Sequence, residues 1–148
     1  MNKTDLHRTC LELLKTQISE RSKAVIDAQE SVFSNAKSSA GDKHETGRAM
    51  LQLEREKLGK QLANNELNLE ILAKINSKGP SSKVGLGSLV VTSKAQYFLG
   101  ISAGAFQHGS RSVYCISMAT PIGKLLLGRA TEDKVTFNGE EITVVAIY

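Results

Sequence analysis

The sequence predicts an α+β protein in which a long antiparallel helical coiled-coil hairpin precedes a small antiparallel sheet with one short helix. Two stretches in the first half repeat apolar residues at the heptad spacing of coiled-coil helices. Both prolines, nine of the twelve glycines and six of the seven aromatic residues follow position 78, among short runs rich in β-branched residues. The two halves therefore follow different structural rules, helical first and strand-rich second.

The first half is expected to form two helices, because two series of positions alternate steps of three and four residues. The first series is Leu11, Leu14, Ile18, Arg21, Val25, Ala28 and Val32, and the second is Leu51, Arg55, Leu58, Leu62, Asn65, Leu69 and Leu72. Between them, Gly41 is a typical helix stop and Asp42 a typical helix start. Each apolar stripe is narrow, which favours a two-helix rod with arms of roughly 45–55 Å over helices packed into a globular core.

The two series also fit each other when the chain reverses near Lys43. Residues that face each other then have numbers that sum to about 86–87, which follows from antiparallel heptad pairing. Leu14 faces Leu72 in this register, and the polar exception Arg21 faces the polar exception Asn65. The pairs Ile18–Leu69, Val25–Leu62, Ala28–Leu58 and Val32–Arg55 follow from the same sum.

The second half is expected to begin after a polar, turn-forming joint at residues 77–83. Five strands are predicted at Ser88–Thr92, Gln96–Ile101, Ser112–Ser117, Lys134–Asn138 and Glu141–Ile147. A short helix is predicted after Pro121, which suits a first helical turn, and ends before Gly128. The domain prediction is a hairpin at 1–78 with its tip near 40–47, a linker at 79–83 and a C-terminal domain at 84–148.

Composition excludes several classes of protein. The net charge of +4 is compatible with a nucleic-acid or polymerase partner but does not require one. Cys10 and Cys115 are the only cysteines and no CxxC occurs, so a disulfide scaffold and a zinc ribbon are excluded. Each cysteine is interpreted as a small apolar residue of its helix or strand. No signal core or membrane-span-length apolar run is present, so a soluble cytoplasmic protein without membrane contact is expected.

The motifs resemble the Gre-type bacterial transcript-cleavage factors, of the GreA and GreB kind. The resemblance rests on the run Ile116-Ser117-Met118-Ala119-Thr120-Pro121-Ile122-Gly123-Lys124-Leu125-Leu126-Leu127-Gly128, followed by Asp133-Lys134-Val135-Thr136-Phe137. At the tip, Gly41-Asp42-x-x-Glu45 is similar to the Gly-Asp-x-x-Glu of that family. The similarity covers about residues 84–148 by motif and the hairpin by architecture, and it implies a C-terminal domain like FK506-binding prolyl isomerases.

The resemblance implies a transcription elongation regulator that binds RNA polymerase and inserts its hairpin into the secondary channel. Thr120, Pro121 and Ile122 fall in the polymerase-docking region. Asp42 and Glu45 take the catalytic, metal-positioning role, holding a Mg²⁺ ion shared with the polymerase to stimulate cleavage of backtracked RNA. The chain itself is then not an enzyme and holds no cofactor stably. A monomer is expected, with contact to nascent RNA or DNA only through the polymerase.

The tip residues also fit a purely structural role. Asp42 as N-cap with Glu45 three residues on is a capping box, which needs no metal. The family continues its acidic pair with Asn-Ala-Glu-Tyr, where this chain has Thr46-Gly47-Arg48-Ala49. Two further functions therefore stay open: a non-cleaving channel binder that modulates or inhibits RNA polymerase, and a stand-alone protein-interaction module.

Overall fold

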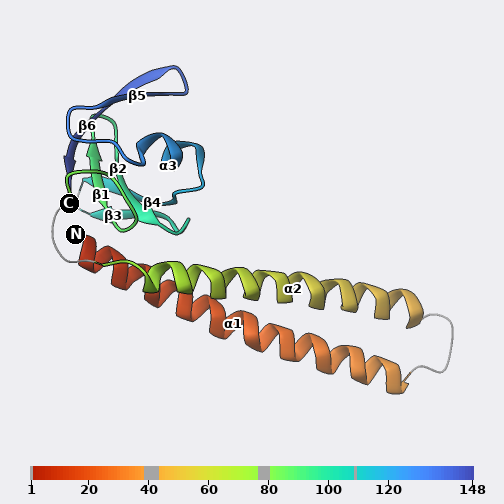
Figure 1. The fold of residues 1–148 in the computed structure, drawn as a ribbon. Helices are drawn as coiled ribbons and strands as arrows, with labels where there is room; N and C mark the ends of the chain where they lie inside the picture. Colours follow the sequence, from red (N-terminus) through yellow and green to blue (C-terminus); the bar gives the residue numbers. More distant parts are fainter. Residues whose placement is uncertain (1, 39–43, 77–80, 109) are drawn as a thin grey trace. The chain divides into compact units, whose positions relative to one another are not determined.

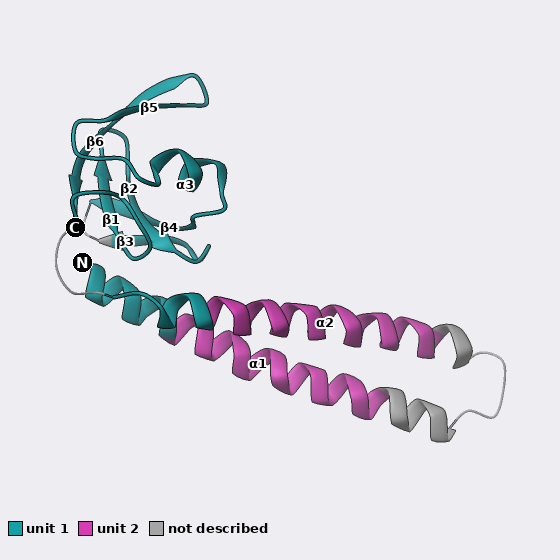
Figure 2. Ribbon diagram, in the orientation of Figure 1, with its two compact units in different colours: residues 1–11, 70–148 teal, residues 12–69 magenta. Residues whose placement is uncertain are grey.

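A computed structural model describes residues 2–38, 44–76, 81–108 and 110–148, except for the side chains of 32–38, 44–46 and 108. Its elements follow the order α1, α2, β1 to β4, α3, β5 and β6 (Figure 1). The chain forms two compact units, one of residues 1–11 with 70–148 and the other of residues 12–69 (Figure 2). The domain boundaries expected from the sequence remain predictions.

The unit of residues 12–69 contains the greater part of two long antiparallel helices, as Figure 1 shows. Helix α1 spans Lys3–Ser38 and helix α2 spans His44–Ala73, which are 36 and 30 residues long. At 1.5 Å per residue these helices measure about 54 and 45 Å. The predicted helical hairpin is therefore confirmed, with the chain reversing between the two helices.

The other unit is built on a six-stranded sheet in the order β3-β4-β2-β1-β6-β5. Its strands are β1 (Leu89–Thr92), β2 (Gln96–Gly100), β3 (Gly104–His108), β4 (Arg111–Ser117), β5 (Lys134–Phe137) and β6 (Glu140–Ile147). All neighbouring strands are antiparallel except β2 and β4, which run parallel with Phe98 opposite Cys115. The α+β class is confirmed, whereas the expectation of five strands, all antiparallel, is wrong.

The additional strand explains both differences. The predicted interval between Ile101 and Ser112 contains β3, which forms an antiparallel hairpin with β4 at one edge of the sheet. Because this hairpin turns the chain around once more, β4 lies beside β2 in the same direction. Parallel neighbours require such a connection, since a tight turn alone can join only antiparallel strands.

The turn between β5 and β6 shows how local sequence fixes one part of the sheet. Asn138 and Gly139 are the two loop residues, and Phe137 pairs with Glu140 across them. Their φ angles are +51° and +77°. Two-residue hairpins favour turns with positive φ at both positions, which Asn-Gly adopts at low cost. This turn places Val135 and Ile142 opposite each other in the core.

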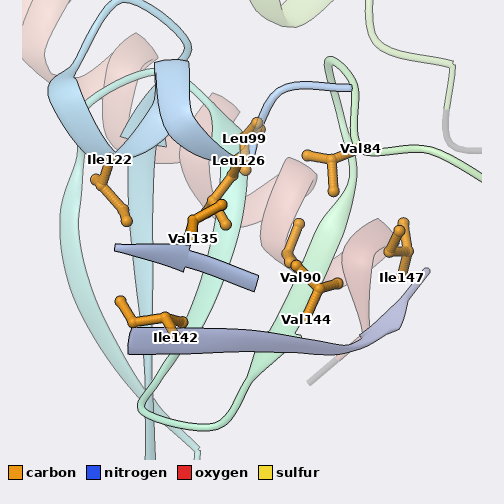
Figure 3. Close-up of a cluster of buried hydrophobic side chains, with 9 residues drawn as sticks. All are labelled: Val84, Val90, Leu99, Ile122, Leu126, Val135, Ile142, Val144 and Ile147. Atoms are coloured by element: carbon orange, nitrogen blue, oxygen red, sulfur yellow. The ribbon is translucent and has the colours of Figure 1, made fainter. Parts of the chain in front are cut away.

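Buried aliphatic side chains lie between the sheet and helix α3, which spans Pro121–Leu126 (Figure 3). Leu126, Leu99, Val90 and Val144 are completely buried in this cluster. Its other members are Val84, Ile122, Val135, Ile142 and Ile147. Burial of each such side chain stabilises the fold by about 1.5–3 kcal/mol relative to exposure, so this cluster anchors α3 to the sheet.

A second group of buried side chains in the same unit comes from the end of α2 and the residues that follow it. A Cβ atom added to Gly100 would lie 3.3 Å from Ile75 and 3.7 Å from Leu72, so both side chains lie over this glycine of β2. Gly87 has a φ of +85° and is approached even more closely by Ile75.

In the part of the chain that the structure describes, neither long helix has an apolar stretch of the length that a membrane span needs.

Candidate functional sites

The acidic pair expected at the hairpin tip lies where the structure gives no side-chain geometry. Asp42 falls outside the described residues, and Glu45 lies in the first turn of α2 with its side chain also outside the description. The capping-box and metal-positioning roles of Asp42 and Glu45 both remain predictions. Among the described residues, no three His, Cys, Asp or Glu side chains are grouped so that they could hold a metal ion.

A polar layer crosses the interface between α1 and α2 inside the hairpin. Asn65 is only 2% exposed, and its Oδ1 accepts a hydrogen bond from Nη1 of Arg21. Its Nδ2 donates to Oε1 of Gln17 at 3.0 Å. The expected pairing of Arg21 with Asn65 is therefore confirmed. A buried polar contact of this kind favours one register, because a slipped register would leave its donors and acceptors unpaired.

The expected docking segment has a rigid backbone at the start of α3. Thr120 is the N-cap residue, and its Oγ1 accepts from the backbone N–H of Gly123 at 3.2 Å. The same hydroxyl donates to the carbonyl of Ser117 at 2.6 Å, which ties the helix start to the end of β4. Pro121 occupies the first turn, where its missing N–H costs nothing. The three-residue motif is thus fixed by hydrogen bonds and by the proline ring.

The side chains of this segment divide between the core and the surface. Ile122 is 8% exposed and belongs to the core, so it supports the segment from inside. Pro121 and Lys124 are exposed, and Leu127 is 46% exposed although it is a large apolar residue. Sequence reasoning did not single out Leu127 as a surface residue, because it sits in a run of three leucines of which one is fully buried. The docking role of the segment stays a prediction.

An open groove of about 520 Å³ lies among the β1–β2 turn, the start of β4 and β6. Its lining includes Lys94, Arg111 and Tyr114, and no carboxylate, histidine or cysteine among the side chains that the structure describes. The ring of Tyr114 lies 5.9 Å from that of Tyr97, measured between centroids. Burial, and secondarily the neighbouring Tyr114, raise the pKa of Tyr97 above its usual value. Among the described lining residues, Lys94 and Arg111 give the groove a positive charge, and Tyr114 gives it an aromatic ring.

The two cysteines meet in space, which the sequence did not predict. Their Sγ atoms are 3.7 Å apart, and the exposed fractions are 0% for Cys10 and 3% for Cys115. Both belong to the same compact unit, and neither forms a disulfide in the structure. Nearby on α1, Nε2 of His7 donates to the carbonyl of Leu72 at 2.8 Å. The apolar setting of each cysteine was predictable from its neighbours, but their contact across 105 positions was not.

Comparison with known proteins gives structural likeness without a sequence family. No protein-family model matches the chain, and no curated protein matches it. Among solved structures, it is similar to GreA factor homolog 1 (Gfh1) of Thermus thermophilus, with 23% identity and a TM-score of 0.39 over 93% of each chain. A second structure, of the transcription factor Gfh1, is 24% identical with a TM-score of 0.38 and covers 93% of this chain and 92% of that one. At these values the likeness does not assign a family or a function.

Proposed function

We propose that this chain is a transcription elongation regulator that binds RNA polymerase and inserts its helical hairpin into the secondary channel. The observation that carries the proposal is the two-helix unit, with helices of 36 and 30 residues held in register by a buried polar layer. A narrow, stiff pair of helices suits a task in which a side chain must reach a distant centre through a confined passage.

The surface proposed to contact the polymerase is the exposed side of the α3 segment. Thr120 and the Pro121 ring hold its backbone in one conformation, so little entropy is lost when a partner binds. Lys124 supplies a positive charge and Leu127 an exposed apolar contact. A fixed apolar contact beside a charge is a common anchor in protein interfaces.

A binding assay with purified core RNA polymerase tests the docking surface. Lys124→Glu and Leu127→Ser are each expected to weaken binding about tenfold, which corresponds to about 1.4 kcal/mol. Lys83→Glu is the control with the same charge change, because Lys83 is exposed but lies outside the segment. If the unmodified chain does not bind the polymerase at all, the stand-alone interaction module replaces this function.

The tip carboxylates are proposed to stimulate cleavage of backtracked RNA. In that role Asp42 and Glu45 contribute oxygen ligands to a Mg²⁺ ion shared with the polymerase, and the ion supplies activation of the attacking water. The double variant Asp42→Asn/Glu45→Gln separates this role from capping, because Asn and Gln keep the capping-box hydrogen bonds but remove both charges. Cleavage of RNA in stalled complexes should be lost, with thermal stability and polymerase binding unchanged.

A non-cleaving regulator is the second candidate, favoured by the composition of the tip. Residues 37–48 carry three basic side chains, Lys37, Lys43 and Arg48, against the two carboxylates. A tip without net negative charge is poorly suited to attract a divalent cation. A chain that binds the polymerase and changes elongation, but never yields short 3′ RNA fragments, would identify this function.

A further inference from the structure

The two cysteines form a contact that the proposed function does not use. Cys10 follows the fully buried Leu6 by one helical turn on α1, and both lie in the unit that contains the sheet. Cys115 lies in β4, opposite Phe98 of β2 and Gly104 of β3. Since Gly104 has no side chain, the position beside Cys115 on β3 carries no bulk. The two sulfurs are 3.7 Å apart.

This distance is close to what a disulfide needs. A disulfide bond has an S–S length of about 2.05 Å, so the two sulfurs must approach each other by roughly 1.7 Å. A change of χ1 at one residue moves a sulfur over distances of this order without moving the backbone. Because the chain has no other cysteine, each of the two can form an intramolecular disulfide only with the other.

The contact also makes the two thiols unequal. The hydrogen-bond contact with Cys115 lowers the pKa of Cys10, against the opposing effect of burial. The same contact, burial and the neighbouring negative sulfur all raise the pKa of Cys115. The two thiols therefore titrate as a pair, in which one sulfur keeps its proton when the other is ionised.

We propose that Cys10 and Cys115 are an oxidation site at which hydrogen peroxide produces an intramolecular disulfide joining the start of α1 to β4. The Cys10 thiolate attacks one peroxide oxygen, an S–O bond forms, the O–O bond breaks, and the departing hydroxide takes up a proton to become water. The sulfur of Cys115 then attacks the resulting sulfenic acid, its proton leaves with the displaced hydroxide as a second water, and the S–S bond forms. Two thiols are oxidised by two electrons and one peroxide is reduced by two.

Burial determines how this reaction starts. Both thiols are covered in the folded chain, so the peroxide reaches Cys10 when the first turns of α1 open locally. Cys10 lies only two turns from the beginning of α1 at Lys3, where a helix end opens more readily than its middle. When the helix closes again, the sulfenic acid meets Cys115 at contact distance. The finished disulfide then prevents this opening.

Peroxide treatment of the reduced full-length chain tests the proposal directly. After the treated chain is unfolded in urea and its free thiols are blocked with N-ethylmaleimide, the intact mass should show no adduct and a loss of about 2 Da, reversed by dithiothreitol. Non-reducing peptide mapping should join the Cys10 and Cys115 peptides within one chain. The oxidised chain should melt roughly 5–15 °C above the reduced chain, because the bond closes a ring of about a hundred residues. Low concentrations of urea should accelerate the reaction.

The single variants Cys10→Ala and Cys115→Ala are the matched controls, and each should lose both the mass change and the rise in melting temperature. Two maleimide adducts on the peroxide-treated chain would overturn the proposal, as would disulfide-linked dimers as the main product. A loss of about 2 Da that persists in Cys115→Ala would also overturn it, because that product would be a sulfenamide of Cys10 with a backbone nitrogen. These readouts on the unmodified chain do not depend on whether either variant folds.

Discussion

Gly123 lies where a single added methyl group should destabilise the sheet unit. A Cβ atom at this position would lie 2.3 Å from the carbonyl oxygen of Ser117 and 2.9 Å from Oγ1 of Thr120. The Ser117 oxygen cannot retreat freely, because it accepts from Oγ1 and from the backbone N–H of Thr120 at 2.6 and 3.1 Å. Gly123→Ala must therefore displace either the end of β4 or the start of α3.

The expected cost follows from the hydrogen bonds that this displacement strains. Two bonds to the Ser117 carbonyl, at about 0.5–1.5 kcal/mol each, and the N-cap bond to Gly123, at about 0.5–2 kcal/mol, are at risk. The higher helix propensity of alanine offsets this loss of stability by about 0.5–1 kcal/mol. A net loss of about 2–3 kcal/mol in the free energy of unfolding is expected, which lowers the urea midpoint by roughly 1 M.

Gly59→Ala is the matched control, and the opposite sign is expected. Gly59 lies in the middle of α2, and apart from the backbone of its own helix no described atom lies within 4 Å of an added Cβ. Here alanine should stabilise the helix by about 0.5–1 kcal/mol.

Two spectroscopic signals separate the effects of these glycine substitutions. The chain has no tryptophan, and all three tyrosines lie at positions 97, 114 and 148 in the sheet unit. Tyrosine fluorescence therefore follows that unit, whereas circular dichroism at the helix band follows mainly the long helices. Gly123→Ala should shift the fluorescence transition. An unchanged urea midpoint of the fluorescence signal in Gly123→Ala would refute the predicted clash of the added methyl group with the Ser117 carbonyl. A lower urea midpoint of the helix signal in Gly59→Ala would refute the prediction that this position has space for a methyl group.

Two further predictions concern the hairpin and the alkaline stability of the sheet. Asn65→Ala should lower the free energy of unfolding of the helices, followed by circular dichroism, by about 1–3 kcal/mol, because Arg21 loses its buried acceptor. Asn64 is exposed, so Asn64→Ala should leave this free energy unchanged. Equal effects of the two substitutions would contradict the role of the polar layer. The folded state raises the pKa of Tyr97 above its ordinary 10.0. The contribution of this residue to the free energy of unfolding is therefore complete below pH 10 and is lost as pH rises further. The melting temperature measured by calorimetry should therefore fall above pH 10, and Tyr97→Phe should reduce this fall. An identical fall in both proteins would exclude Tyr97 as its source.

Several features could be predicted from the sequence because they depend on short-range periodicity. The heptad series predicted both long helices and the meeting of Arg21 with Asn65, since the positions that face a partner helix repeat every three or four residues. The start of α3 was equally readable, because Pro121 in the first turn and Gly128 after the end are local signals. The tip carboxylates could be named from sequence, and their geometry remains a prediction.

Other features depend on where distant segments meet, and only the tertiary structure decided them. Strand β3 was missed because Gly104–His108 lacks an apolar alternation, and its pairing with β4 supplies the stability that its own residues do not. The parallel pairing of β2 with β4 follows from that extra strand. The contact of Cys10 with Cys115 joins residues 105 positions apart. Periodicity specifies which face of an element is buried, but the three-dimensional path of the chain decides which residues share that burial.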